Sequence, residues 1–449
     1  MVEAKYTPNI VYSGNPLIEA LPPQLTPEEL WKEFYRYDDS SVDGYSANER
    51  SALAYRRLRN MYIPMDFVWD VYRSIYEGLW SAYDGWEDKT SRQHLNKIGA
   101  AIQQRNFQYV PDAESQAQSM ALLGEGGMGK SRCIDKILMK FDQAIRHTSE
   151  YGPYMEGHIQ IPYIKVQCPQ QNTSRGLCMQ ILQEVDQILG TNMLATEAKA
   201  NVDMLIARIA AVCVKYSVGV IIVDEIQNII HFHSKNGDGS SQIIRFLVEL
   251  SNKSGVCICC VGTMDVGPFF DREPHLMRRT RGPRIKHFEN DETFQELCRL
   301  MIKTVPLKHQ GEVGRDVTDM VYKYTCGIIG NMQRLISDAA AIVIGQPVEQ
   351  FTPELIRTAA CRLALDGTKR KLMTTGQDAH FLMNPNDKKQ KVATTIKKQV
   401  PAAPKKQRGR PKSAREDGDL LVIYAKCKER GIPVARYLLQ HELAQEVKL

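Results

Sequence analysis

The feature that most constrains the fold is a glycine-rich loop, in which residues 124–131 read G-E-G-G-M-G-K-S. Four apolar residues, M-A-L-L, precede the loop, and an amphipathic stretch follows it. The loop fits the pattern G-x-x-x-x-G-K-[ST], whose glycines reach backbone dihedrals that a Cβ would hinder where the chain wraps a phosphate. A glycine turn without a ligand is the alternative. The sequence therefore predicts a buried strand, a phosphate-binding loop and a helix in succession.

The chemistry expected at this loop is the binding of ATP with Mg²⁺. Backbone amides and the amino end of the following helix would point at the phosphates. Lys130 would neutralise the β- and γ-phosphate oxygens, and the hydroxyl of Ser131 would ligate the metal ion. The residues predicted to surround the nucleotide are Gly124, Glu125, Gly126, Gly127, Met128, Gly129, Lys130, Ser131 and Arg132.

A second motif ends an apolar run at residues 218–228, which read V-G-V-I-I-V-D-E-I-Q-N. Two acids at the end of a buried strand are costly unless a cation meets them, and the run matches a Walker B motif. We expect Asp224 to hold Mg²⁺ through water, and Glu225 to orient or deprotonate the attacking water. An acidic pair that caps a helix is the alternative. Together with the glycine-rich loop, the motif indicates an ATPase.

Further candidates for the nucleotide site are two sensors and a group of arginines. Thr263, which ends the apolar run 257–263, would sense the γ-phosphate; a threonine that only caps a strand is the alternative. Arg334, in the run G-I-I-G-N-M-Q-R, could swing over the nucleotide or face solvent from a capping turn. An arginine supplied by a neighbouring subunit could stabilise the transferred phosphoryl group, although a solvated basic face or a DNA-facing patch is an equal alternative. The candidates for that role are Arg278, Arg279 and Arg281.

The pattern of apolar residues predicts an α/β core followed by helices. Short apolar runs alternate with helical stretches, which is typical of a largely parallel sheet that is buried on both faces. The expected strands are 120–123, 161–166, 218–223, 256–261 and 284–288, and the expected later helices are 293–305, 315–324, 330–344 and 353–365.

These patterns divide the chain into six predicted segments. A segment that is low in large apolar groups and rich in Lys, Pro, Gln and Thr is expected to be disordered, because it cannot bury enough surface. The segments are an extended N-terminal arm at 1–46, a helical N-terminal domain at 47–117, the α/β nucleotide-binding core at 118–290, a helical lid at 291–369, a basic disordered linker at 370–419 and a C-terminal helical docking element at 420–449.

The positive charge of the chain is concentrated in one segment. The formal net charge is +6, but residues 385–412 hold ten lysines and arginines against one acid, so the remainder is weakly acidic. Such a segment favours binding to a polyanion, and R-G-R-P flanked by lysines resembles an AT-hook, which lies in a narrow A·T minor groove. A solvated linker is the alternative. The predicted DNA contacts are Lys405, Lys406, Arg408, Gly409, Arg410 and Pro411, with Arg175 and Lys199 as candidates in the folded core.

The cysteines and the hydropathy suggest where the protein works. Eleven cysteines are scattered through apolar segments, which suggests reduced thiols; Cys257 and Cys260 form a C-x-x-C, but they lie in a strand-like run without a second pair. No apolar run approaches the roughly 18 residues that span a bilayer. We therefore expect a cytoplasmic protein.

The nucleotide motifs together resemble the AAA+ superfamily, and more narrowly its TnsC/TniB branch of transposition regulators. They are the glycine-rich loop, V-D-E-I-Q-N, V-G-T and G-I-I-G-N-M-Q-R. The likeness sharpens at residues 15–23, at Ser241 and Gln242, and at residues 168–192, and it covers about residues 10–365. It implies an AAA+ P-loop NTPase core, with a parallel sheet and flanking helices, beside a helical N-terminal domain and a helical lid.

The same resemblance implies a function. The protein would be an ATP-dependent regulator that forms a homo-oligomeric ring or filament on double-stranded DNA. It would read a target selector of the TnsD/TniQ type, recruit transposase subunits of the TnsA/TnsB type and use ATP hydrolysis as a switch. A replication initiator or helicase loader would share every nucleotide residue, and a scaffold ATPase that touches no DNA is a further alternative.

Overall fold

The computed structural model of the 449-residue chain describes residues 1–84, 91–104, 119–168, 173–197, 200–228, 239–267, 282–309, 311–363 and 365. The chain divides into two compact units, residues 1–379 and 380–449, and all the described residues belong to the first. The predicted linker and the predicted C-terminal helices lie outside the described residues. Each described helix is too short or too polar to span a bilayer.

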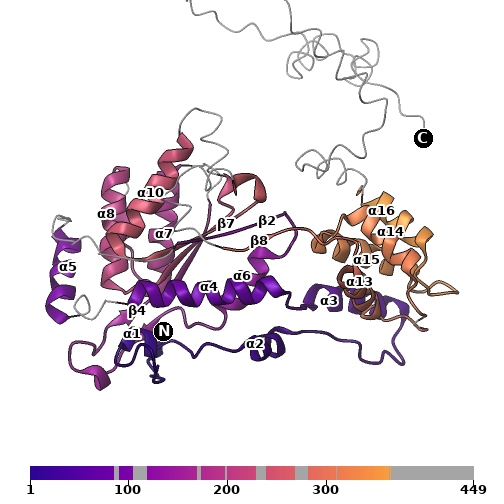
Figure 1. Cartoon of the computed structure of the whole chain (residues 1–449), viewed down its shortest axis with the longest axis horizontal. Helices are drawn as coiled ribbons and strands as arrows, with labels where there is room; N and C mark the ends of the chain where they lie inside the picture. Colours follow the sequence, from indigo (N-terminus) through magenta and orange to yellow (C-terminus); the bar gives the residue numbers. More distant parts are fainter. Residues whose placement is uncertain are drawn as a thin grey trace, which may run out of the picture. The chain divides into compact units, whose positions relative to one another are not determined.

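The centre of the first unit is a sheet of five parallel strands (Figure 1). The strands are β2 (Met120–Gly124), β5 (Tyr163–Gln167), β6 (Val220–Asp224), β7 (Cys257–Gly262) and β8 (Arg284–Ile285). Their order is β5-β6-β7-β2-β8, so β7 lies between the strand before the glycine-rich loop and the strand that ends in Asp224. β2, β6 and β7 are buried throughout, as expected of parallel strands that are covered on both faces.

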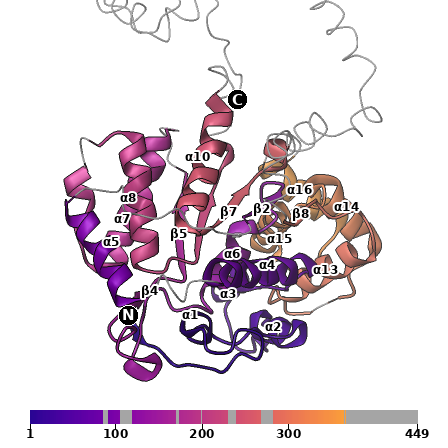
Figure 2. The same cartoon turned by 60° about the vertical axis from the view of Figure 1, so that its left-hand side comes forward.

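Helices cover both faces of this sheet (Figures 1 and 2). They are α4 (Asp66–Tyr83), α6 (Lys130–Leu138), α7 (Ser174–Leu189), α8 (Val202–Lys215) and α10 (Gly239–Ser254). The chain runs from β2 to the far edge at β5 and then returns through β6 and β7. Because such crossovers are right-handed, this reversal places α6 on one face and α7, α8 and α10 on the other. α4 contacts α6 and the strands β2, β6 and β7.

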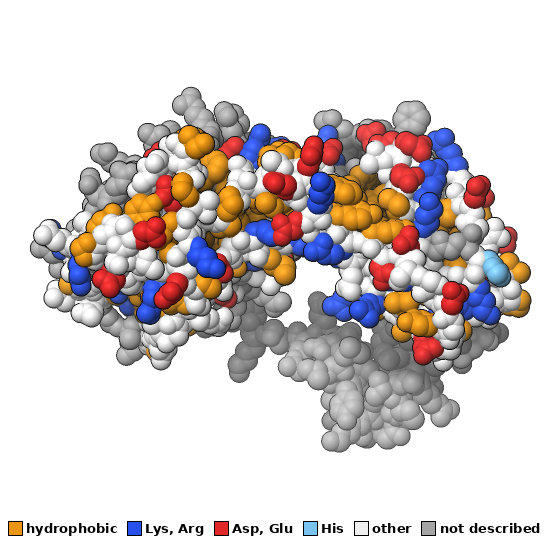
Figure 3. Space-filling model, turned by 90° about the horizontal axis from the view of Figure 1, so that it is seen from below, with side chains coloured by type: hydrophobic (Ala, Val, Ile, Leu, Met, Phe, Trp, Pro, Cys, Tyr) orange, Lys and Arg blue, Asp and Glu red, His pale blue; other side chains and the backbone are white. Residues whose placement is uncertain are grey.

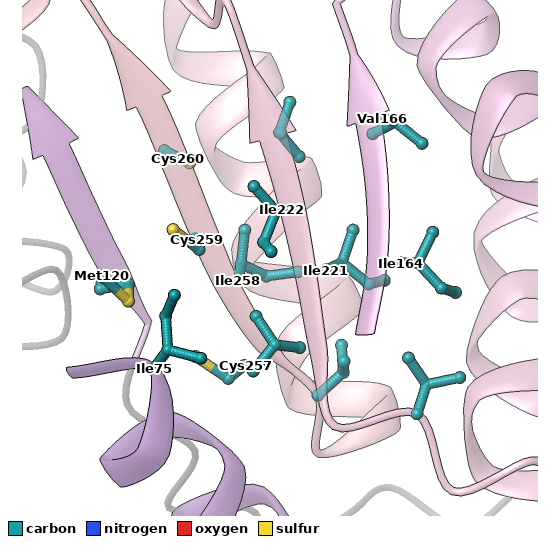
Figure 4. Packing of buried hydrophobic residues seen from close by; sticks show 14 of the residues in the cluster. Ile75, Met120, Ile164, Val166, Ile221, Ile222, Cys257, Ile258, Cys259 and Cys260 are labelled. Atoms are coloured by element: carbon teal, nitrogen blue, oxygen red, sulfur yellow. The ribbon is translucent and has the colours of Figure 1, made fainter. Parts of the chain in front are cut away.

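α4 is held close to the sheet by its amphipathic pattern. Its buried residues recur at helical spacing, and they include Val68, Val71, Tyr72, Ile75 and Leu79. A Cβ at Gly78 would lie 2.7 Å from the sulfur of Cys257, so glycine allows the close approach. Ile75 lies beside Cys257 and Met120 in the core beneath the strands (Figure 4).

A second hydrophobic cluster holds the lid together. Its helices are α13 (Glu292–Lys303), α14 (Arg315–Thr325), α15 (Ile329–Val343) and α16 (Pro353–Arg362). Ala54 and Leu58 of α3 (Ala47–Asn60) belong to the same cluster. Arg50 of α3 also forms a buried ion pair with Glu349, with N–O distances of 2.5 and 2.6 Å. α3 therefore packs as part of the lid, although it precedes the sheet in the sequence.

Residues 1–46 contain short ordered elements and a buried segment. They include β1 (Val2–Glu3), α1 (Pro16–Glu19) and α2 (Pro27–Phe34), and β1 pairs with β3 (Ile145–Arg146), which pairs with β4 (Ile159–Gln160). Leu17, Ile18 and Leu21 are buried in the main core. The side chain of Gln160 donates a hydrogen bond to the Leu17 carbonyl at 2.8 Å. This segment is thus docked against the core instead of being a plain extended arm.

The helices of residues 47–104 are distributed between the two clusters. α3 packs on the lid, α4 packs on the sheet, and α5 (Arg92–Gln104) packs against α8. Within the described part of the chain, these helices enclose no hydrophobic core of their own. Their distribution brings the segment that joins α3 to α4 next to the glycine-rich loop.

Candidate nucleotide-binding site

The glycine-rich loop joins the end of β2 to the beginning of α6. Gly127 and Gly129 have φ values of +85° and +86°, in the left-handed region that favours glycine. Gly129 is the residue immediately before α6, so the free amides at the helix start face the loop. A Cβ at Gly126 or Gly129 would meet nothing within 4 Å. The loop therefore leaves room beside its backbone, as a phosphate cradle requires.

Lys130 closes the loop from its first helical position. Its ammonium group donates hydrogen bonds to the carbonyl oxygens of Gly124 at 2.8 Å and Glu125 at 2.9 Å. Burial lowers the pKa of Lys130, and the nearby carboxylates of Glu225 and Asp224 oppose that shift. Phosphate oxygens that enter the loop could replace the two carbonyl partners of this cation.

The acidic motif stands at the carboxyl end of β6. Asp224 is buried with a relative exposure of 7%, and its Oδ1 accepts a hydrogen bond from the amide of Glu225 at 2.9 Å. Its Oδ2 lies 3.9 Å from the ammonium of Lys165, which also donates to Asp135 of α6. The Asp224 carboxylate and the Ser131 hydroxyl, at the start of α6, would together offer only oxygen donors, which is the donor type that Mg²⁺ prefers.

The strands β6, β7 and β2 are parallel neighbours, so their carboxyl ends lie at one edge of the sheet. Glu225 and Thr263 therefore lie at the same edge as the loop. Glu225 has a φ of +58°, which is uncommon for a residue with a side chain and turns the backbone directly after β6. The hydroxyl of Thr263 is buried without a hydrogen-bond partner among the described residues, and it makes no capping bond to the short helix that follows. Thr263 directly follows β7, as both the sensor role and the strand-capping alternative require, so the sensor role stays a prediction.

A cavity of about 120 Å³ lies beside the loop, and sequence reasoning did not identify it. It has three walls: the loop with Arg132, the segment after α3, and the lid helices α13 and α15. Its lining is mainly apolar, as pockets for flat aromatic ligands are. Ile329, Gly330 and Gln333 of the lining come from the run G-I-I-G-N-M-Q-R. The lining residues outside the predicted nucleotide motifs are Leu58, Met61, Tyr62, Ile63, Met65, Phe67, Val68, Leu297 and Met301.

Two contacts in the cavity wall join its three parts. The guanidinium of Arg132 lies 5.4 Å from the ring centre of Tyr62 and donates to the Arg59 carbonyl at 2.8 Å. The amide of Gly330 donates to the carbonyl of Gly127 at 2.8 Å, and a Cβ at Gly330 would lie 3.0 Å from that oxygen. The lid therefore touches the phosphate loop through a glycine. These partners come together only in the folded chain, so no local sequence signal reveals them.

The other predicted site residues have different outcomes. Arg334 is exposed on α15, about one helical turn beyond Gly330, and its sensor role stays a prediction. Arg175 lies on α7 and donates a hydrogen bond to the Ala200 carbonyl. The remaining candidates lie outside the described residues: Arg278, Arg279, Arg281, Lys199, Lys405, Lys406, Arg408, Gly409, Arg410 and Pro411.

The C-x-x-C cysteines are core residues of β7. Cys257 and Cys260 are buried, and burial raises the pKa of each thiol to about 12. Thiols of this kind are protonated and poor ligands. Among the described residues, no group of three or more His, Cys, Asp or Glu side chains could hold a metal ion.

Comparison with known families identifies the core. Residues 113–267 match the family model of the AAA domain, and this range contains the glycine-rich loop, the acidic motif and Thr263. The motif geometry and this match show an AAA+ P-loop NTPase fold, in which a parallel sheet is flanked by helices. No curated protein matches the chain.

Several solved structures are similar at low identity. The Orc1 protein of Aeropyrum pernix in complex with DNA has a TM-score of 0.38 and 13% identity, and the match covers 67% of this chain and 72% of that one. Drosophila ORC bound to DNA has a TM-score of 0.37 and 10% identity, covering 80% and 75%. The RuvB Holliday junction branch migration motor of Thermotoga maritima has a TM-score of 0.31 and 11% identity, covering 79% and 87%. Likeness at this level says nothing about function.

Proposed function

We propose that this protein is an ATP-hydrolysing AAA+ switch that regulates DNA transposition. The single observation that carries the nucleotide part is the meeting of Lys130, Asp224, Glu225 and Thr263 at one sheet edge, beside an apolar cavity. Three adjacent strands, β6, β7 and β2, each end in one of these motifs. A cation, two acids and a buried hydroxyl are the groups that phosphoryl transfer to water requires.

In the proposed site each residue has one task. The loop amides and Lys130 would bind the phosphates, and the cavity between Tyr62 and the lid would take the adenine base. Mg²⁺, held by Ser131 and through water by Asp224, would neutralise charge on the phosphate oxygens. Glu225 would accept a proton from the attacking water, and Thr263 would hydrogen-bond the γ-phosphate.

Two substitutions test the nucleotide switch. Lys130→Ala should abolish ATP binding, because it removes the buried cation that faces the phosphates. Glu225→Gln should keep ATP binding and stop turnover, because an amide does not accept the proton. Nucleotide binding by fluorescence and phosphate release measure the two effects separately. Unchanged assembly on DNA by Lys130→Ala in the presence of ATP would contradict the switch.

The transposition part of the proposal is supported by the motif resemblance and by charge. The face of the molecule in Figure 3 carries acidic and basic side chains interspersed, without a field of one sign. Residues 385–412 hold ten lysines and arginines against one acid, so this segment is the proposed contact with the DNA backbone.

Electron microscopy with duplex DNA and a slowly hydrolysed ATP analogue tests whether the protein assembles on DNA. Rings or filaments on DNA would support a regulator, and isolated monomers would favour a scaffold ATPase. Pull-down with transposase subunits against a replicative helicase separates the regulator from a helicase loader.

A further inference from the structure

One side chain, that of Gln227, connects the acid and the threonine of the proposed site. Its Nε2 donates a hydrogen bond to Oε2 of Glu225, and its Oε1 accepts one from the backbone amide of Thr263 at 3.3 Å. An amide is suited to this bridge, because it carries donors and acceptors at the same end. A glutamate would offer only acceptors there, and a leucine would offer neither a donor nor an acceptor.

The fold makes room for this bridge at the end of β7. A Cβ at Gly262 would lie 3.0 Å from Oε1 of Gln227 and 2.7 Å from a methyl group of Ile226. The amide of Ile226 also donates to the carbonyl of Val261 at 3.0 Å, so the turn after β6 is folded onto the neighbouring strand. The positive φ of Glu225 begins that turn.

The bridge holds Glu225 on the side of the phosphate loop. Among the acids that raise the pKa of Lys130 against the effect of burial, Glu225 acts most strongly, ahead of Asp224. Glu225 directly follows β6, whose carboxyl end lies at the same edge of the parallel sheet as the end of β2, so Glu225 stands on the side of the phosphate loop while Gln227 holds its Oε2. The amide of Gln227 neither gives nor takes the proton of the reaction.

We propose that Gln227 is a positioning residue for hydrolysis, which fixes the Glu225 carboxylate toward the phosphate loop and ties it to the end of β7. The Thr263 hydroxyl that would engage the γ-phosphate and the Glu225 carboxylate would then be held by one support, because Gln227 bonds the backbone amide of Thr263 and the carboxylate of Glu225. This inference rests on the proposed role of Glu225 as the base.

Two substitutions of Gln227 separate its two hydrogen bonds. Gln227→Leu removes both, and Gln227→Glu keeps the acceptor for Thr263 but removes the donor to Glu225. Each should lower kcat for ATP hydrolysis by about 10- to 100-fold, the range that corresponds to losing one hydrogen bond to a charged group. The Kd for a fluorescent ATP analogue should change less than about threefold, since Gln227 is not in the phosphate loop. Gln346→Leu, the same change at an exposed position of the lid, is the matched control and should leave both values unchanged.

Hydrogen exchange of the Thr263 amide gives a readout that is independent of turnover. Gln227→Leu should speed exchange at this amide, because its acceptor is gone, and Gln227→Glu should keep the wild-type protection. A kcat within twofold of wild type in both variants would overturn the proposal. So would a fall in kcat that is matched by an equal loss of nucleotide affinity, since that would indicate general damage to the site.

The double variant with Glu225→Gln tests whether Gln227 acts through Glu225. If it does, Gln227→Leu should lower the residual rate of Glu225→Gln by less than about twofold, because residues that act as a unit are not additive. Turnover near the wild-type rate in Glu225→Gln alone would instead refute the base role and hence the proposed function. Loss of turnover in Glu225→Gln with full turnover in Gln227→Leu would refute only the positioning role.

Discussion

At the scale of single residues, the hydroxyl of Thr263 is a buried polar group for which the proposed function supplies a partner. Its hydroxyl is buried at the end of β7 and has no partner among the described residues, although its backbone amide does. Buried polar groups without partners cost free energy, and structures keep them rarely. The end of a strand beside a phosphate loop is where a γ-phosphate oxygen would supply the missing acceptor.

Thr263→Val should therefore separate stability from activity. The variant is isosteric and removes an unsatisfied hydroxyl, so we expect an unchanged or slightly raised melting temperature. The hydrolysis rate should fall about tenfold or more, the equivalent of at least ~1.4 kcal/mol in the barrier. Thermal unfolding and steady-state phosphate release measure the two effects. A melting temperature that falls by several degrees would instead mean that the hydroxyl has a structural partner.

At the scale of elements, the buried strands of the central sheet were predictable, whereas β1, β3 and β4 were not predicted. The predicted strand 120–123 differs from β2 by one residue, and the predicted strand 218–223 overlaps β6 with a shift of one or two residues. Strands that are buried on both faces read as continuous apolar runs, so their position is visible locally. The ends of the lid helices were predicted to within three residues, because the spacing of apolar residues along a helix is also a local signal.

Partners that are distant in the sequence were not predictable. α3 has an ordinary amphipathic pattern, which says that one face is buried but not that the lid buries it. The cavity between Tyr62 and Gly330 depends on that packing, so the sequence showed the phosphate loop and the acids but not the adenine side of the site. Gln227 belongs to the Walker B sequence 218–228, but its contacts with Glu225 and Thr263 could not be predicted, because they depend on the turn after β6.

The joint between α3 and the lid should be sensitive to its buried ion pair. Arg50→Met leaves Glu349 buried without its charged partner, which typically costs about 3–5 kcal/mol. Arg315→Met is the control, because Arg315 is exposed and its ion pair with Asp319 is long, at 4.0 Å. An exposed pair of this kind contributes at most about 1 kcal/mol to stability. Urea unfolding of the two variants measures the difference. Equal losses would show that the buried pair does not hold α3 on the lid.

The docking of the N-terminal residues should depend on pH. His147 hydrogen-bonds Tyr6 and Gln160, and His158 hydrogen-bonds Ser217. Burial lowers the pKa of His147 to about 4 and that of His158 to about 3, below the unfolded value of 6.5. Their contribution to stability is therefore complete above pH 6.5 and is lost as the pH falls through these folded-state values.

The double variant His147→Gln/His158→Gln tests this pH dependence. Its glutamines can hydrogen-bond but cannot be protonated, so its melting temperature should fall less steeply than that of wild type between pH 6.5 and pH 4. Circular dichroism at a series of pH values measures both slopes. Parallel curves for the two proteins would exclude the histidines as the cause.

At the scale of the whole molecule, the charge distribution along the sequence separates the proposed nucleotide switch from the proposed DNA contact. The ten lysines and arginines of residues 385–412 lie far along the chain from the phosphate loop. Each phosphate that a protein neutralises on duplex DNA adds about 0.9 to the slope of log K against log salt. Deleting residues 385–412 should therefore flatten this slope by several units and leave ATP binding unchanged.

A second variant decides how the segment binds. Shuffling residues 405–412 keeps the charges and breaks the R-G-R-P order. If the arginines enter the minor groove, the shuffled protein should keep the wild-type salt slope but lose its preference for A·T-rich duplexes. If the segment binds only as a string of charges, the shuffle should change neither quantity. If the deletion leaves the slope of log K against log salt unaltered, the folded core makes the DNA contacts. The slope counts the phosphates that the protein neutralises, and the deleted lysines and arginines can no longer contribute to it.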